Sequence, residues 1–174
     1  MLFRSVPYPL IYDPGWQMDF PSLEKAGTAR TRGVVEVHPN NPTGSYVKRS
    51  EAVALNEFCR ERRLSLIVDE VFLDYALGDP NAGNTGSLHA PLNRQSPIQR
   101  LGRDDNKGFC NSFAGNRDVL TFTLSGLSKI SALPQMKVAW VVTSGPDADV
   151  AEAMARLEVI ADTYLSMNAP VQWA

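Results

Sequence analysis

The sequence has few of the features that mark whole classes of protein. It contains only two cysteines, Cys59 and Cys110, in 174 residues. They are too few for a disulfide framework, and neither stands in a metal-ligand spacing. No apolar run approaches the roughly 18 residues of a membrane-spanning helix, and the N-terminus lacks the apolar core of a signal peptide. These absences argue against a disulfide-rich secreted module and a membrane partner, and they predict a reduced, cytoplasmic location.

An excess of charge of one sign is also missing. Seventeen lysines and arginines against 19 aspartates and glutamates give a net charge of −2, so there is no electrostatic case for nucleic acid or an anionic membrane as partner. What is present suits a globular protein, with 44% hydrophobic and 21% charged residues. The length is enough for one domain with a core of its own.

Apolar runs alternate with helical patterns, and this alternation predicts an α/β domain. A helix that Ser50 is expected to cap presents Leu55, Phe58 and Cys59 on one face, so these side chains are expected in the core. It joins two predicted strands in a βαβ unit with a right-handed crossover. The runs that predict strands are residues 34–37, 64–68, 120–124 and 138–142.

The remaining segments have weaker patterns. Residues 1–29 predict an extended connector with one short helix over 21–26. Residues 76–118 show no period, so we expect a long loop, either a surface flap or a locally disordered insertion, with His89 as a solvated loop histidine. A last helix, opened by Pro146, carries an apolar stripe that we expect to pack in the core: Val150, Met154, Leu157, Ala161 and Tyr164.

Polar residues follow three of the predicted strands. Asn41 lies in the run His-Pro-Asn-Asn-Pro-Thr-Gly after the first strand, and Asp69 follows the second. Lys129 is the last residue of the stretch 123–129, which begins in the third strand and continues beyond it. Strands joined by helical crossovers present their carboxyl ends at one edge of the sheet, so these side chains are expected to converge there. A lysine at the mouth of an apolar strand is expected to be desolvated and thereby nucleophilic. The alternative is an ordinary strand-end lysine.

Together and in this order, the three motifs resemble the class I/II, fold-type-I pyridoxal-phosphate (PLP) aminotransferases. The resemblance runs from about Tyr8 to Trp173. It implies a three-layer αβα architecture with a mostly parallel sheet. Residues 1–174 would form a single, partial large domain, and the family's N-terminal part and small C-terminal domain would be absent. The chain alone is therefore expected to be inactive.

The resemblance also implies PLP as the cofactor and assigns roles around it. Lys129 matches the Schiff-base lysine, whose amine moves a proton between the substrate's α-carbon and the cofactor. Asp69 matches the carboxylate that faces the ring nitrogen, and Asn41 the donor to the cofactor's 3′-oxygen. Ser128 and Lys137 match positions on the phosphate side.

Three positions depart from the family pattern. Lys137 stands where arginine is usual, which keeps the charge but loses the two-pronged fork. Phe72 stands in the place of a tyrosine that commonly bonds the 3′-oxygen, and Tyr75 is an alternative donor. Gly126 stands where some members carry a phosphate-binding serine, and Ser125, one residue earlier, is an alternative to it.

The resemblance implies that the complete protein transfers an amino group between an amino acid and a 2-oxo acid, as a homodimer. A fold does not determine its reaction, so a lyase, a decarboxylase or an acyl-transferring synthase remains an alternative. Two further alternatives are a non-catalytic, cofactor-sensing module of a transcriptional regulator and an inactive remnant.

Overall fold

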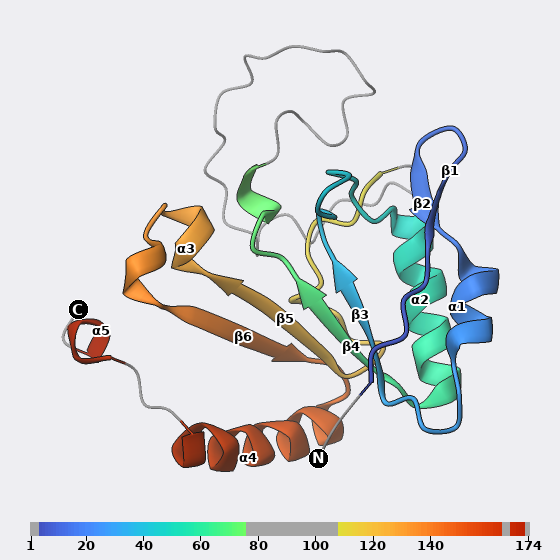
Figure 1. The fold of residues 1–174 in the computed structure, drawn as a ribbon. Helices are drawn as coiled ribbons and strands as arrows, with labels where there is room; N and C mark the ends of the chain where they lie inside the picture. The colour runs from blue at the N-terminus through green and yellow to red at the C-terminus, as the bar shows by residue number, and fades with distance from the viewer. Residues whose placement is uncertain (1–3, 76–107, 165–167, 173–174) are drawn as a thin grey trace.

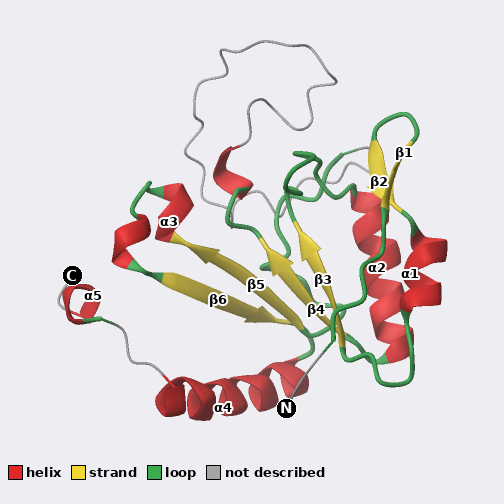
Figure 2. Ribbon diagram, in the orientation of Figure 1, coloured by secondary structure: helices red, strands yellow, loops and turns green. Residues whose placement is uncertain are grey.

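A four-stranded sheet forms the centre of the computed structural model, which describes residues 4–75, 108–164 and 168–172. The strand order is β3-β4-β5-β6. The first three strands run parallel and β6 is antiparallel to β5 (Figures 1 and 2). The predicted α/β class with a mostly parallel sheet is therefore confirmed. The strands are β3 (Gly33–Val37), β4 (Ser65–Asp69), β5 (Thr121–Gly126) and β6 (Ala139–Ser144).

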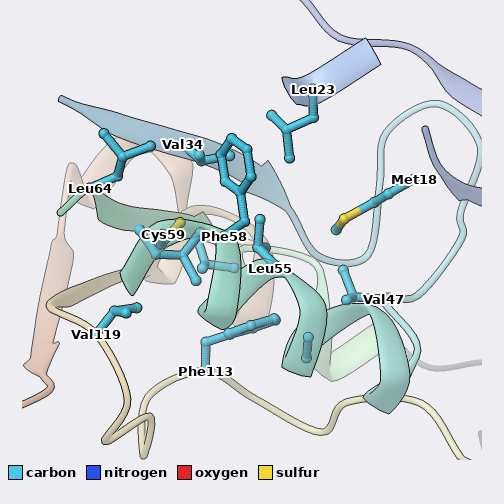
Figure 3. Packing of buried hydrophobic residues seen from close by; sticks show 13 residues of the cluster. Met18, Leu23, Val34, Val47, Leu55, Phe58, Cys59, Leu64, Phe113 and Val119 are labelled. Carbon is cyan, nitrogen blue, oxygen red and sulfur yellow. The ribbon is translucent and has the colours of Figure 1, made fainter. Parts of the chain in front are cut away.

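Two helices, α1 (Phe20–Ala26) and α2 (Arg49–Arg62), cover one face of this sheet. Their apolar faces meet the strands in one cluster (Figure 3). Within it, Leu55, Cys59 and Leu66 are completely buried. Burial of one such aliphatic side chain stabilises the fold by about 1.5–3 kcal/mol. The core position predicted for Cys59 is confirmed. Of the three layers expected for the whole fold, the described residues supply the sheet and this helical layer. Val35, on the opposite face, is 59% exposed.

The start of α2 differs from the prediction in its capping residue. The helix begins at Arg49, so Ser50 lies inside it. The buried carboxylate of Glu51 provides the closure instead: Oε2 accepts the Lys48 N–H at 2.8 Å. Oε1 accepts the Met18 N–H, also at 2.8 Å. Glu51 therefore caps α2 and ties the N-terminal segment to it.

That N-terminal segment is more ordered than predicted. It holds an antiparallel hairpin of β1 (Leu10–Tyr12) and β2 (Trp16–Met18) before the expected short helix. Gly15 adopts a left-handed φ of +101°, which glycine reaches without steric cost, and the Asp13 N–H donates to its carbonyl at 3.0 Å. The prediction of a plain connector was wrong because this turn was overlooked.

The last long helix, α4 (Asp147–Tyr164), corrects another expectation. Its stripe was predicted to pack in the core, yet Met154 is 51% and Tyr164 77% exposed, and only Ala153 of the helix is buried. Figure 1 shows α4 leaving the end of β6 and lying apart from α1 and α2. Among the described residues, little therefore covers the stripe. No helix in the described ranges is long and apolar enough to cross a membrane.

The segment that leads into β5 is irregular but closely attached to the rest of the fold. Phe109 bridges to Lys48, and the Cys110 N–H donates to the Val47 carbonyl at 2.7 Å. Phe113 is only 2% exposed, in the core cluster. This segment is the end of the predicted 76–118 loop. Residues 76–107, with His89, lie outside the described residues, as do the predictions made for them.

Candidate active site

The ends of three parallel strands are aligned at one edge of the sheet. Val37 and Leu124 are the register partners of Asp69 on its two sides. The ladder continues past this row, because the His38 N–H donates to the Asp69 carbonyl and the Glu70 N–H to the Leu124 carbonyl, both at 2.9 Å. The loop with Asn41, the end of β4 and the helix with Lys129 all leave from this edge (Figure 1).

Asp69, the last residue of β4, is oriented by the turn that follows it. Its Oδ1 accepts the Val71 N–H at 3.1 Å, and the side chain is half-buried. Within the described part of the chain, Oδ2 has no hydrogen-bond partner. One oxygen therefore holds the carboxylate in place while the other is available to a ligand at the strand end.

Lys129 lies in a single helical turn, α3 (Leu127–Ile130), directly after β5. Its ammonium nitrogen is 5.5 Å from the centroid of the Phe72 ring, and its main-chain carbonyl accepts a hydrogen bond from the Tyr75 hydroxyl. The side chain is exposed, so the expected desolvation is not provided by the described residues. The physical reason is that α3 carries the lysine beyond the apolar end of β5. The Tyr75 hydroxyl is engaged on the main chain and does not stand free as an alternative donor.

The loop with Asn41 is built by its neighbour. The Asn40 N–H donates to the Ser45 carbonyl at 2.8 Å, and the Asn40 carbonyl accepts the Gly44 N–H at 2.7 Å. The Thr43 hydroxyl donates to the Asn40 side-chain oxygen at 2.9 Å. Asn41 itself is exposed, and its side chain makes no hydrogen bond to the described residues. The turn chemistry therefore belongs to Asn40, and the Asn41 amide remains available for a ligand.

His38 fixes this loop, a role that the sequence analysis missed. It is completely buried; Nδ1 accepts the Val47 N–H at 3.1 Å, and Nε2 lies 2.9 Å from the Cys110 carbonyl. These partners assign the neutral tautomer with the proton on Nε2. Burial lowers the pKa of His38 to about 4, although the bond to Cys110 opposes this shift. The available signal was a histidine directly after an apolar strand and before the proline-rich loop.

Glu70 is the second group that was missed. It follows Asp69 directly and is only 4% exposed; Oε1 accepts the Phe113 N–H and Oε2 the Ser112 hydroxyl, each at 2.7 Å. Burial raises its pKa to about 7, although both hydrogen bonds favour the charged form. Glu70 therefore joins the end of β4 to the segment before β5. Its signal was a second acid immediately beside the candidate Asp69.

Gly126 explains one departure from the family pattern. A Cβ on this residue would lie 2.7 Å from the Val138 carbonyl oxygen and 3.1 Å from the Ala139 Cα. The close approach belongs to the β5–β6 pair, which continues with a 3.0 Å hydrogen bond from the Leu127 N–H to the same carbonyl. A serine therefore does not fit here unless β6 moves.

The remaining residues predicted to contact the phosphate lie at the end of β5 and in the segment that joins β5 to β6. Ser125 is in β5 and Ser128 in α3; both are half-buried, and neither hydroxyl bonds to a described residue. Lys137 is exposed, with a left-handed φ of 54°, directly after the 3₁₀ turn η3 (Pro134–Met136) that packs on α3. The segment between α3 and β6 thus folds back on α3, the helix that carries Lys129, just before Lys137.

The comparison with known proteins adds to this geometry. The model of the family described as aminotransferase class I and II matches residues 3–174. The chain belongs to this family. Glutamate-pyruvate aminotransferase AlaA of Escherichia coli (strain K12) is 27% identical over 98% of this chain and 36% of its own length. The alanine aminotransferase of Mycobacterium bovis is 27% identical over 92% of this chain and 31% of its own.

Solved structures show the same fold. An alanine aminotransferase from Pyrococcus furiosus matches 90% of this chain and 34% of its own with a TM-score of 0.59 and 21% identity. N-succinyldiaminopimelate aminotransferase from Mycobacterium tuberculosis matches 83% and 30%, with a TM-score of 0.52 and 26% identity. The chain thus spans about a third of the length of these relatives. Their family depends in general on PLP.

Proposed function

We propose that the whole protein is a cytoplasmic, PLP-dependent aminotransferase that exchanges an amino group between an amino acid and a 2-oxo acid. The observation that carries this proposal is the alignment of three adjacent strand ends, which present Asn41, Asp69 and Lys129 at one edge in a chain of the class I and II family. Parallel sheets of this kind bind ligands at the carboxyl ends of their strands.

The residues at this edge fit PLP by their chemistry. An amine, a carboxylate oxygen and an amide come from Lys129, Asp69 and Asn41, and none of these atoms has a hydrogen-bond or ion-pair partner among the described residues. Ser125, Ser128 and Lys137 add two hydroxyls and a positive charge, which suit a phosphate. Phe72 offers an aromatic ring 5.5 Å from the Lys129 ammonium instead of a hydrogen-bond donor.

In the proposed reaction, Lys129 would supply the amine that holds the cofactor and would then move a proton at the substrate's α-carbon. Asp69 would hold the cofactor's protonated ring nitrogen, and Asn41 would donate a hydrogen bond to its ring oxygen. Ser128 and Lys137 hold the phosphate. PLP, when bound, supplies a ring that accepts the electrons released at the α-carbon.

We also propose that the complete protein is a homodimer. The support is apolar surface on β6 and α4: Trp140, Val141 and Val142 of β6 are 39%, 47% and 39% exposed, and Met154 and Tyr164 of the α4 stripe are 51% and 77% exposed. Apolar patches of this kind mark surfaces that another chain or further segments cover.

The function is tested in the full-length protein with PLP, by following amino transfer from an amino acid to a 2-oxo acid. Lys129→Arg should abolish the transfer, because its guanidinium stays charged and cannot act as a nucleophile or base. Lys137→Arg is the matched control, since it keeps a cation at the phosphate side, and it should retain activity. Equal activity of Lys129→Arg and the parent protein would refute the assignment.

A further inference from the structure

The segment after Asp69 carries two aromatic rings in fixed relation. It closes into the 3₁₀ turn η1 (Leu73–Tyr75), in which the Tyr75 N–H donates to the Phe72 carbonyl at 3.0 Å. The two rings meet edge to face, with centroids 6.4 Å apart and an interplanar angle of 68°. Such a pair restricts both side chains, so a contact made by one ring constrains the other.

Both rings contact the same lysine, more than fifty residues later in the chain. The Tyr75 hydroxyl donates to the main-chain carbonyl of Lys129, which also accepts the Ala132 N–H at 3.2 Å. The ammonium of Lys129 lies 5.5 Å from the Phe72 ring centroid, within the range of a cation–π contact. One turn thus holds the backbone and the charged end of the lysine separately.

The backbone contact lies at the end of a very short helix. A helix leaves its last four carbonyls without helical partners, and α3 consists of Leu127–Ile130 alone. The Tyr75 hydroxyl therefore gives the Lys129 carbonyl a second hydrogen bond, beside the one from the Ala132 N–H, and ties the end of this short helix to η1. The ring contact in turn limits the many rotamers that an exposed lysine otherwise samples.

We propose that Tyr75 is a positioning residue for Lys129, and that it acts together with the face of Phe72 as an aromatic clamp. This inference rests on the proposed function in one respect only, namely that Lys129 is the reactive amine. Because the clamp begins three residues after Asp69, the placements of the acid and the amine are linked through one turn. It also gives Phe72 a role that needs no hydroxyl group.

The clamp can be measured without any cofactor, by pulse labelling of the 174-residue protein with trace acetic anhydride near neutral pH. Peptide mass mapping gives the labelling rate of Lys129 relative to Lys25, an exposed lysine on α1 that serves as internal reference. The variants are Phe72→Leu, which removes the aromatic face, and Tyr75→Phe, which removes only the hydroxyl.

The proposal predicts that Phe72→Leu raises the Lys129-to-Lys25 ratio by about two- to fivefold, the value of a cation–π contact at an exposed site. Tyr75→Phe should raise it in the same direction by less. The double variant should match Phe72→Leu alone, because the Tyr75 hydroxyl acts on the ammonium only by holding the Lys129 backbone in place beside the Phe72 ring. The increase should fade as the pH rises, since a neutral amine is not held by the ring.

Two controls separate positioning from a general loss of structure. Phe72→Tyr keeps the aromatic face and should restore the parent ratio. Tyr12→Phe removes a hydroxyl from the distant β1–β2 hairpin, where Tyr12 is 70% exposed, and should leave the ratio unchanged. A loss of global stability alone would change the unfolding transition but not the pH-dependent ratio in the native protein.

An unchanged ratio in both Phe72→Leu and Tyr75→Phe, or an equal rise at Lys25, would overturn the clamp. The proposed function is judged separately, by whether PLP becomes attached to Lys129 in the parent protein. Attachment with an unchanged labelling ratio refutes the clamp and leaves the function standing. A raised ratio without attachment supports the clamp and refutes the role of Lys129 in the reaction.

Discussion

The two sides of the candidate site are held in different ways. On the side of Asn41, the buried ring of His38 bonds to both Val47 and Cys110, and Asn40 closes the loop from within. On the side of Lys129, a one-turn helix is held by an exposed tyrosine and the face of a phenylalanine. Buried hydrogen bonds are costly to break, whereas exposed contacts contribute little. The loop with Asn41 is thus the rigid side of the site, because buried hydrogen bonds hold it. Lys129 is held by exposed contacts that a reaction can break.

The largest effect is expected from breaking the rigid side. His38→Phe keeps a ring in the core but leaves the Val47 N–H and the Cys110 carbonyl without their partner. Each buried group that loses its partner costs about 1–3 kcal/mol, so for the two groups we expect a loss of about 2–6 kcal/mol in the free energy of unfolding. Urea denaturation measures it. Tyr75→Phe is the matched change on the lysine side, and a loss as large as that of His38→Phe there would break the comparison.

The pH dependence sharpens the same point. The pKa of His38 falls from 6.5 to about 4 on folding, so the neutral ring stabilises the fold above about pH 6.5 and this contribution is lost as the pH falls towards 4. Glu70 has the opposite sign. Its pKa rises from 4.5 to about 7, so its contribution is present below pH 4.5 and is lost as the pH rises through 7.

Removing His38 should therefore change the slope of stability against pH in a predictable direction. Between pH 4 and 6.5, His38→Phe should gain less stability with rising pH than the parent, by up to about 1.4 kcal/mol per pH unit. Denaturation at a series of pH values checks this. Parallel curves for the two proteins would show that His38 does not titrate on unfolding.

On the lysine side, Gly126 is a position where the neighbouring strand leaves no room for a side chain. Gly126→Ala and Gly126→Ser should both destabilise the fold, by about 1–3 kcal/mol, because the added Cβ meets the Val138 carbonyl oxygen at 2.7 Å. The two variants should be equal, since the Cβ and not the hydroxyl causes the clash. A stable Gly126→Ser variant that binds PLP more tightly than the parent would contradict this account.

The smallest effect concerns Thr123, in the strand that leads to Lys129. Its hydroxyl is buried and has no hydrogen-bond partner among the described residues. Thr123→Val removes this hydroxyl at nearly constant shape, so we expect stabilisation by up to about 1 kcal/mol. Thermal unfolding measures the change, and a clear loss of stability would indicate a partner for the hydroxyl in solution.

The elements that position the site were largely predictable because their signals are local. Short apolar runs such as 64–68 identify strands, and the residue after each run must lie at the sheet edge. That reasoning places Asp69 correctly at the end of β4. It also places Asn41 and Lys129 after their strands, although it considers a turn-building role only for Asn41, whereas Asn40 makes the hydrogen bonds of the turn.

What could not be predicted depends on contacts between distant residues. The role of His38 requires Cys110, 72 residues away, and the placement of Lys129 requires Tyr75, 54 residues away. The stripe on α4 shows a related limit: periodicity identifies an apolar face but not whether anything covers it. The exposure of Lys129 was missed for the same reason, because a strand pattern does not say how far the following turn carries its side chain.

The central claim is that Lys129 is the amine that attaches PLP. The most direct measurement is incubation of the full-length protein with PLP, reduction with borohydride, and peptide mass mapping of the labelled lysine. The account predicts label on Lys129, and none at that site in Lys129→Arg. Label on another lysine of the parent protein, with Lys129 unmodified, would contradict it.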